Sequence, residues 1–176
     1  MNSNSITRVR AAIRDIPDFP KPGIIFKDIT PILADGSLFK ESIDLFVNAC
    51  AGQQIDKIVG VDARGFLFGA AAAYKLGTGF IPMRKKGKLP FRTAAMTYSL
   101  EYGEAEVEMH VDAITPGQRI VLIDDLLATG GTAAAAIKLI QSMGGELVSA
   151  LFLIELEFLE GRKVLECQNV HSFITF

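Results

Sequence analysis

Hydrophobic and polar positions follow two different periods along the chain. Apolar residues recur at helical spacing in three stretches, residues 5–16, 38–50 and 66–76. Short and nearly continuous apolar runs predict buried strands instead. These runs cover residues 57–61, 80–83, 120–123, 147–155 and 170–176.

Two further strand-like segments, 96–102 and 105–111, flank Gly103 and predict a β-hairpin. The remaining strands alternate with helices through short connections, an order typical of a mostly parallel sheet with helices on both faces. We therefore expect a doubly wound α/β fold in a single domain, residues 1–176, with the hairpin as an insertion.

Segment 119–143 contains the clearest candidate site. We expect Asp124 and Asp125 at the carboxyl end of a central strand, where open α/β sheets bind ligands. Carboxylates there can accept hydrogen bonds from vicinal hydroxyls or help to hold a divalent cation. A glycine-containing loop follows and leads into a helix, so its backbone can approach an anion closely. The loop consists of Ala128, Thr129, Gly130, Gly131 and Thr132.

A plain turn, bent at Gly130 and Gly131 and capped by the two acids, is the alternative explanation. We favour a phosphate and sugar-hydroxyl site because the buried strand, the acids and the threonine-flanked glycines coincide. The loop differs from two common phosphate-binding motifs. The nucleoside-triphosphate P-loop has a lysine directly after its glycines, and this loop has none. The spacing of the glycines also differs from that of the dinucleotide-binding fingerprint.

Composition narrows the class of protein. With 176 residues and 49% hydrophobic content the chain can bury a substantial core, and its net charge of −2 gives no overall nucleic-acid-binding surface. No apolar run approaches the ~20 residues of a membrane span, and residues 1–17 lack the apolar core of a signal peptide. We expect a cytoplasmic protein with no membrane or nucleic-acid partner, whose Cys50 and Cys167 are free.

The segment IDDLLATGGT, residues 123–132, resembles the signature of the type I phosphoribosyltransferases, in the form found in the adenine branch of that family. Four more segments resemble the family in the family's order: FPKPGIIFKDITPIL (19–33), VDARGFLFG (61–69), RKKGKLP (84–90) and YSLEYG (98–103). The resemblance implies that the loop 128–132 holds the 5′-phosphate of 5-phosphoribosyl 1-diphosphate. It also implies that Asp124 and Asp125 face the ribose hydroxyls.

Asp62 and Arg64 follow the strand at 57–61, beside the same crevice. A guanidinium there can donate a fork of hydrogen bonds to diphosphate oxygens. Charge alone equally allows Arg64 to pair with Asp62 or with a surface carboxylate. The resemblance implies that this arginine faces the diphosphate.

Four cations surround Gly87, at Arg84, Lys85, Lys86 and Lys88. A solvated run of charge is the usual explanation, but this run follows a buried strand and leads into the hairpin. The resemblance implies that Arg84, Lys85 and Lys88 contact the diphosphate, some of them from a neighbouring subunit. It therefore implies a homodimer.

Glu101 and Tyr102 lie in the hairpin, and periodicity alone is explained by an ordinary strand. The resemblance makes residues 84–111 a basic loop and a flexible lid. Glu101 would be the general acid/base that handles the imidazole proton of the purine, and Tyr102 would pack over the site. A lid suits this chemistry because an activated ribosyl group exposed to water would be lost.

The segment PKPGIIFKDITP, within residues 1–35, is an apolar stretch punctuated by proline and glycine, and its composition allows a packed connector. The resemblance implies a hood over the base. The backbone of Ile25 and Lys27 would read the edge of the base, and Phe26 would stack on its ring. Lys27 stands where the family usually has arginine.

The resemblance as a whole implies a purine salvage enzyme that converts adenine and 5-phosphoribosyl 1-diphosphate to AMP and diphosphate. Mg²⁺ would bridge the ribose hydroxyls and the diphosphate near Asp124 and Asp125. Two alternatives stay open. One is a transferase for another base, such as hypoxanthine or xanthine, and the other is a ligand-sensing regulator without catalysis on the same fold.

Overall fold

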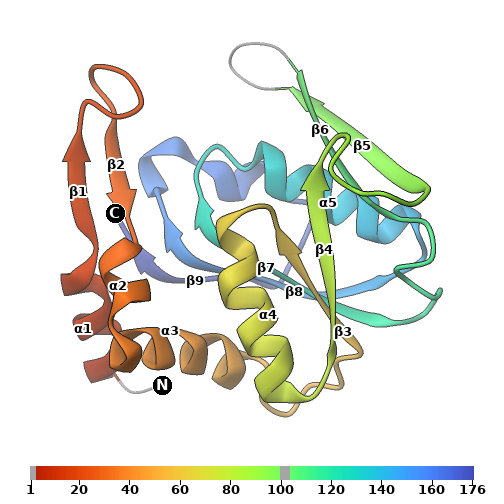
Figure 1. Cartoon of the computed structure of the whole chain (residues 1–176), viewed down its shortest axis with the longest axis horizontal. Helices are drawn as coiled ribbons and strands as arrows, with labels where there is room; N and C mark the ends of the chain where they lie inside the picture. The colour runs from red at the N-terminus through yellow and green to blue at the C-terminus, as the bar shows by residue number, and fades with distance from the viewer. Residues whose placement is uncertain (1–2, 100–103) are drawn as a thin grey trace. The chain divides into compact units, whose positions relative to one another are not determined.

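The chain divides into two compact units, Met1–Ala49 and Cys50–Phe176, in a computed structural model that describes residues 3–99 and 104–176 (Figure 1). No helix within those described ranges is both long and apolar enough to cross a membrane. The organisation as a single domain, with a hood over residues 1–35, stays a prediction.

The larger unit is built on a seven-stranded sheet with the strand order β5-β6-β4-β3-β7-β8-β9. Its strands are β3 (Lys57–Val61), β4 (Gly79–Lys85), β5 (Thr93–Ser99), β6 (Glu104–His110), β7 (Arg119–Leu127), β8 (Glu146–Glu155) and β9 (Val170–Thr175). Strands β4, β3, β7, β8 and β9 are parallel, whereas β5 and β6 form an antiparallel hairpin that joins β4. The expected mostly parallel sheet is confirmed.

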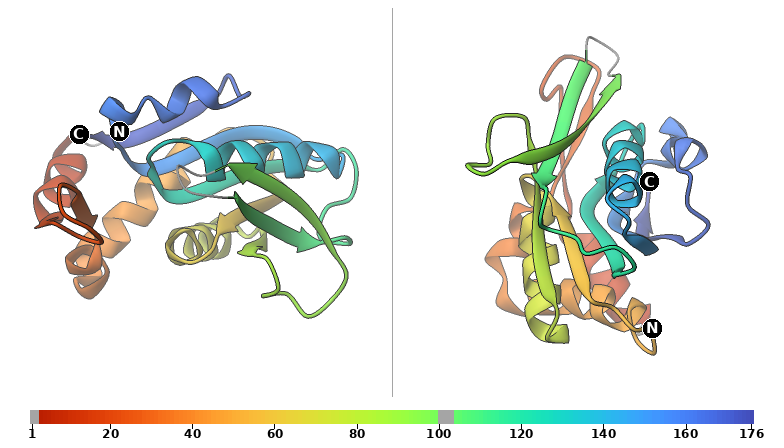
Figure 2. Two further views of the ribbon diagram at one scale, coloured as in Figure 1. Left: turned by 90° about the horizontal axis from the view of Figure 1, so that it is seen from above. Right: turned by 90° about the vertical axis from the view of Figure 1, so that its right-hand side faces the viewer.

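Helices α4 (Arg64–Leu76) and α5 (Gly131–Ser142) cover opposite faces of this sheet (Figure 2). The strand order explains why, because the chain steps from β3 through α4 to β4 in one direction across the sheet, and from β7 through α5 to β8 in the other. Parallel connections are almost always right-handed, so two steps in opposite directions place their helices on different faces. The expected helices on both faces are confirmed.

The core of the larger unit lies around β7 and α5. Residues Ile120, Val121, Leu122 and Ile123 are fully buried, as expected for a central strand with both faces covered. The hairpin joins this core through Val107 and Met109, which pack in the same cluster as α5. The base of the hairpin is therefore part of the packed sheet.

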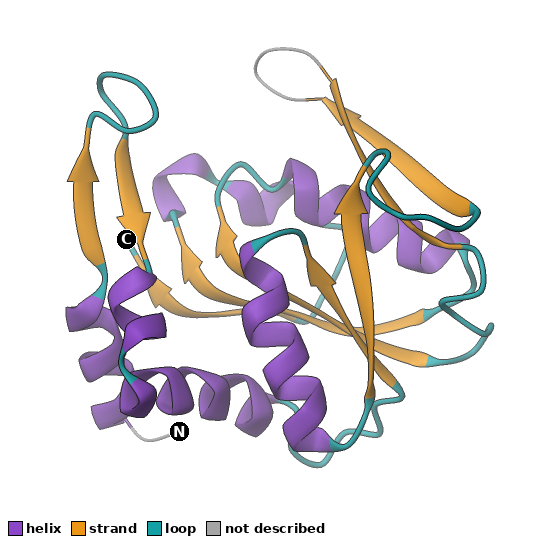
Figure 3. Cartoon of the chain, in the orientation of Figure 1, coloured by secondary structure: helices purple, strands orange, loops and turns teal. Residues whose placement is uncertain are grey.

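The N-terminal unit contains α1 (Ser3–Ala12), β1 (Arg14–Pro17), β2 (Ile25–Asp28), α2 (Thr30–Ala34) and α3 (Gly36–Ala49) (Figure 3). Strands β1 and β2 form an antiparallel hairpin. Two cross-strand ion pairs hold it, Arg14 with Asp28 at 2.6 Å and Lys27 with Asp15 at 2.7 Å. The Thr30 N–H and the Arg14 guanidinium bind the Asp28 carboxylate and lower its pKa to about 2.

Three expected boundaries differ from the structure by three residues or more. The helix predicted over 5–16 ends at Ala12, because the next residues pair with β2 as a strand. The strand predicted over 120–123 runs on to Leu127 through both acids, since β8 continues to pair with it. The first hairpin strand begins at Thr93 rather than at 96. In each case pairing with another strand, rather than the local pattern, sets the boundary.

Candidate functional site

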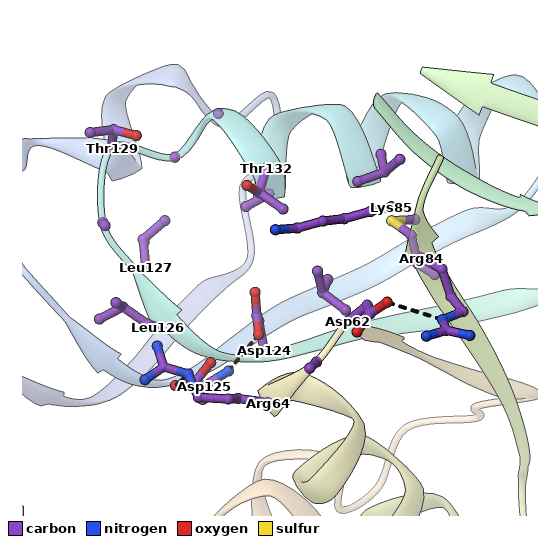
Figure 4. Close-up of a pocket in the computed structure, with 18 residues that line it drawn as sticks. Asp62, Arg64, Arg84, Lys85, Asp124, Asp125, Leu126, Leu127, Thr129 and Thr132 are labelled. Atoms are coloured by element: carbon purple, nitrogen blue, oxygen red, sulfur yellow. Dashed lines mark hydrogen bonds and ion pairs between the residues drawn. The ribbon is translucent and has the colours of Figure 1, made fainter. Parts of the chain in front are cut away.

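A cavity of about 420 Å³ opens at the carboxyl ends of β3 and β7 and at the start of α5 (Figure 4). Most of the predicted site residues of the larger unit line it, and they come from four elements and a loop. The predicted residues in its wall are Arg64, Arg84, Lys85, Asp124, Asp125, Ala128, Thr129, Gly130, Gly131 and Thr132. Residues separated by up to 68 positions in the sequence, from Arg64 to Thr132, thus meet at one place.

The loop between β7 and α5 is shaped to present backbone N–H groups. Gly130 is the N-cap of α5 and has φ +84°, a left-handed conformation that a side chain disfavours. The first turn of a helix leaves its N–H groups without partners inside the helix. Gly131, Thr132 and Ala133 carry these groups and line the cavity. The loop can therefore accept an anion such as a phosphate.

Asp124 and Asp125 are consecutive acids near the carboxyl end of β7. Asp125 is buried, and Asp124 Oδ1 accepts a hydrogen bond of 2.9 Å from the Asp125 backbone N–H. Burial, and then the neighbouring charge of Asp125, raises the pKa of Asp124 well above its ordinary value. Burial also raises the pKa of Asp125, although Arg64 works against it. Two adjacent acids, both with raised pKa values, thus form this part of the cavity wall.

Arg64, the first residue of α4, forms an ion pair with Asp125, with 2.9 Å between Nε and Oδ2. Its partner in this pair is therefore a buried acid of β7. From charge alone, Asp62 or a surface carboxylate was a possible partner. Asp62 instead accepts a hydrogen bond of 3.0 Å from Nε of Arg84. The two acid–base pairs thus join different elements of the larger unit rather than forming within one segment.

The basic residues near Gly87 separate into two groups. Lys85 and Arg84 are in β4 and line the cavity, and the Lys85 side chain points toward Thr132 whereas the Arg84 guanidinium turns to Asp62 (Figure 4). Lys88 is not among the lining residues. Its backbone N–H donates to Glu108 at 3.1 Å, and its carbonyl accepts from Arg84 at 3.1 Å.

Gly65 lets α4 approach the acids. A Cβ atom there would lie 2.7 Å from Asp124 Oδ1 and 3.0 Å from the Ile123 carbonyl. The peptide bond between Asp62 and Ala63, just before this helix, is cis. Only the packing shows that Gly65 faces Asp124.

Some lining residues were not predicted, namely Val61, Asp62, Ala63, Met83, Val107, Leu126, Leu127 and Ala133. Asp62 was considered only as a partner for Arg64. Leu126 and Leu127 lie inside the predicted motif, so their position between the acids and the loop was the available signal. Val107 had no such signal, since it reaches the cavity only through the pairing of β6 with β4.

Other predicted residues lie elsewhere. Glu101 and Tyr102 fall outside the described residues. Ile25, Phe26 and Lys27 are in β2 of the N-terminal unit. Ile25 is 56% exposed, and the Phe26 ring packs edge to face on Phe19 with 5.2 Å between centroids.

Among the described residues, no group of three or more His, Cys, Asp or Glu side chains is arranged to hold a metal ion by itself. A cation at this site would need ligands from a bound substrate in addition to protein oxygens. Asp124 and Asp125 are the carboxylates in the cavity wall beside the loop, and carboxylate oxygen is a ligand that Mg²⁺ accepts.

Known proteins resemble the chain over nearly its full length. Residues 32–170 match the phosphoribosyl transferase domain. The adenine phosphoribosyltransferase of Anaeromyxobacter dehalogenans is 54% identical over 168 residues, covering 96% of this chain and 98% of that protein.

Two solved structures extend the comparison. The adenine phosphoribosyltransferase of Saccharomyces cerevisiae, in complex with an imino-altritol bisphosphate and adenine, has a TM-score of 0.93 at 39% identity, covering 97% of this chain and 99% of that one. The Trypanosoma brucei enzyme, in complex with AMP, pyrophosphate and ribose-5-phosphate, has a TM-score of 0.90 at 25% identity, covering 99% and 80%. On its sequence, its fold and the loop between β7 and α5, the chain belongs to the adenine phosphoribosyltransferase family.

Proposed function

We propose that the chain transfers a phosphoribosyl group from 5-phosphoribosyl 1-diphosphate to adenine, giving AMP and diphosphate. The observation that carries the proposal is the convergence, in one cavity, of an anion-accepting helix start, two acids and the cations Arg64 and Lys85. The relatives supply the ligands: adenine is bound in the yeast structure, and AMP, pyrophosphate and ribose-5-phosphate are bound in that of T. brucei. This reaction serves purine salvage.

The donor substrate would lie with its 5′-phosphate on the loop, where backbone N–H groups and the Thr129 and Thr132 hydroxyls can donate to it. Its ribose hydroxyls can donate hydrogen bonds to Asp124 and Asp125. The diphosphate then lies toward Arg64 and Lys85, with Arg84 beside them. Lys88, outside the cavity wall in this chain, would reach a diphosphate only from a neighbouring subunit or after a rearrangement.

Catalysis follows from position and charge. The purine nitrogen attacks the anomeric carbon as the bond to diphosphate breaks, so positive charge develops on the ribosyl ring and negative charge on the leaving group. Carboxylates fixed near the ring stabilise the first charge, and fixed cations stabilise the second, at no cost in reorganisation. Glu101, from the hairpin, would take or return the imidazole proton of the base.

Mg²⁺ is the proposed cofactor. Asp124 and Asp125 would hold it together with substrate oxygens, in keeping with a site that lacks three protein ligands of its own among the described residues. When bound, the ion would neutralise charge on the diphosphate and so favour its departure.

The base would be bound by the N-terminal hairpin. The exposed side chain of Ile25 and the ring of Phe26 offer an apolar surface for a purine, and backbone groups of Ile25 and Lys27 can read its edge. An amino group and an oxo group demand opposite hydrogen-bond partners, so these backbone contacts would set the choice of adenine over hypoxanthine. Tyr102 would pack over the closed site.

We also propose a homodimer in the cytoplasm. The family resemblance supports the dimer, and the two free cysteines, Cys50 and Cys167, are in keeping with a reducing compartment. Sedimentation or light scattering of the purified protein would measure the oligomer directly.

The test of the function is diphosphate release with 5-phosphoribosyl 1-diphosphate and Mg²⁺, in parallel with adenine, hypoxanthine, guanine, xanthine and orotate. We expect release with adenine alone, matched by formation of AMP. Release with another base would overturn the assignment of adenine as the base. It would leave intact the assignment of residues 128–132 as the phosphate loop, the loop that binds the 5′-phosphate. Binding of the donor substrate without turnover would show a ligand-sensing protein instead. Omitting Mg²⁺ tests the cofactor in the same assay.

A further inference from the structure

The phosphate loop is packed against a segment that comes after β8 in the sequence. The short helices η1 (Glu157–Leu159) and η2 (Gly161–Val164) follow that strand. The Leu156 N–H donates to the Leu127 carbonyl at 2.9 Å, which ties the start of this segment to the residue before the loop. Residues 156–164 are not among those that line the cavity, so they act on the site only through the loop.

Gly161 and Gly130 face each other where the two segments meet. A Cβ on Gly161 would overlap the Ala128 carbonyl oxygen and would lie 2.8 Å from the Gly130 nitrogen. A Cβ on Gly130 would overlap the Gly161 carbonyl oxygen and lie 2.6 Å from Val164 Cγ2. Gly130 also needs glycine for its positive φ, but Gly161 does not have one. The requirement for glycine at 161 is therefore one of space, and the phosphate loop occupies that space.

Arg162 holds this segment in place. Its guanidinium donates to both oxygens of Glu155, at 3.1 and 2.5 Å, to the Val170 carbonyl at 2.6 Å and to the Ser172 hydroxyl at 3.3 Å. Glu155 is buried at the end of β8. Burial alone would raise the pKa of Glu155, but the hydrogen bonds from Arg162 and Ser172 outweigh it and lower the pKa. The carboxylate is thus kept charged as a fixed anchor for the arginine.

We infer that Gly161, anchored through Arg162, is a positioning residue. It sets the position of the phosphate loop backbone in the cavity and so the affinity for the 5′-phosphate of the donor substrate. The inference rests on the proposed function for the identity of that ligand. It needs no contact between Gly161 and substrate, because the glycine acts through the Ala128 carbonyl and the Gly130 nitrogen. Added atoms at 161 must push the loop, since both contacts are backbone.

The test is Gly161→Ala, with Gly36→Ala as the matched control. Gly36 has an ordinary φ, and an added Cβ would have nothing within 4 Å, so alanine fits there. For Gly161→Ala we expect KM for 5-phosphoribosyl 1-diphosphate to rise about tenfold or more, because a shift of about 1 Å in a binding group can cost up to about 100-fold. KM for adenine should change little. Gly36→Ala should match the unaltered protein in both.

Binding of ribose 5-phosphate, measured by calorimetry, gives a readout that does not depend on turnover. We expect its affinity to fall in Gly161→Ala by a factor similar to the rise in KM. If the unaltered protein turned over no base, the proposed function would fail while this binding comparison still decided the inference. An unchanged affinity in Gly161→Ala, or equal rises in both KM values with a lowered melting temperature, would overturn it.

Arg162→Lys is the milder variant, for use if Gly161→Ala does not fold. Lysine keeps the charge beside Glu155 but loses the fork that also reaches Val170 and Ser172. We expect the same selective rise in KM for the donor substrate, smaller in size. A fall in kcat with both KM values unchanged would contradict the positioning role.

Discussion

The phosphate loop and the hairpin β1–β2 hold their candidate binding residues in opposite ways. In the loop, backbone groups are closely packed against Gly161 and Val164, and Gly130 has no room for a Cβ atom. In the hairpin, Ile25 is largely exposed and the strands are held by ion pairs near the surface. We therefore expect the loop to work through the position of its backbone and to tolerate no added atom, and the hairpin to work through the surface of its side chains.

The largest effect is expected for Gly130→Ala. A side chain at positive φ costs roughly 1–2 kcal/mol, and the new Cβ would also meet Val164 and the Gly161 carbonyl. We expect kcat/KM for the donor substrate to fall about 100-fold or more, since the displaced N–H groups no longer meet the phosphate.

Gly117→Ala separates the effect of backbone strain at positive φ from the effect of displacing the phosphate loop. Gly117 has φ +83° but nothing within 4 Å of a Cβ, so its alanine variant shares the backbone strain and lacks the clash. Steady-state kinetics of both variants should show a loss only at 130. Equal losses would mean that the loop responds to general destabilisation, and the contrast between the two regions would disappear.

Asp124→Asn is expected to separate activity from stability. Removing a carboxylate that stabilises developing charge should lower kcat/KM by about 100-fold. The pKa of Asp124 is raised in the folded protein. A raised carboxyl pKa favours folding at low pH, and that contribution is lost as pH rises through the folded-state value.

At neutral pH the charge on Asp124 therefore opposes folding, and asparagine should raise the melting temperature. The gain should shrink as the pH is lowered toward the ordinary aspartate range. Thermal melts at several pH values measure this, with Asp112→Asn, an exposed aspartate, as the control for loss of charge. A lower melting temperature for Asp124→Asn at neutral pH would show that Asp124 is held mainly by its partners.

Phe26→Ala tests the hairpin. Stacking of a base on an aromatic ring is worth about 1–3 kcal/mol, so KM for adenine should rise roughly 5- to 100-fold, with KM for the donor substrate unchanged. Tyr74→Ala removes another aromatic ring, 90% exposed near the end of α4 in the larger unit, and should alter neither value. A rise in KM for the donor substrate in Phe26→Ala would contradict the assignment of the base to the hairpin and of the donor substrate to the loop.

The smallest effect is expected for Lys27→Arg. The Lys27 ammonium binds Asp15 across the hairpin at 2.7 Å, and the Asp15 side chain is 56% exposed. Ion pairs that are open to solvent contribute about 0–1 kcal/mol. If Lys27 reads the base through its backbone, KM for adenine should stay about the same, within the roughly fivefold change that such an energy allows. A much lower KM in the arginine variant would mean that a guanidinium takes part in binding the base.

The fold and the loop were predictable because their signals are local. Strand β3 was predicted with its observed bounds, and the acids of β7 and the glycines at the start of α5 are close together in the sequence. The hairpin β1–β2 was not predicted, since its pairing joins residues on either side of a connector that has no clear period. Helix α2, of five residues, was too short for its pattern to stand out.

The sequence by itself determined the order of elements, the family and the loop, because periodicity and a contiguous motif are properties of neighbouring residues. Only the tertiary structure decided that Arg64 pairs with Asp125 and Arg84 with Asp62, and that Gly161 packs under the phosphate loop. These contacts join residues far apart in the chain. From charge and size alone, each of these residues has many possible partners in the sequence. The packing of β7 between β3 and β8 decides which of them come into contact.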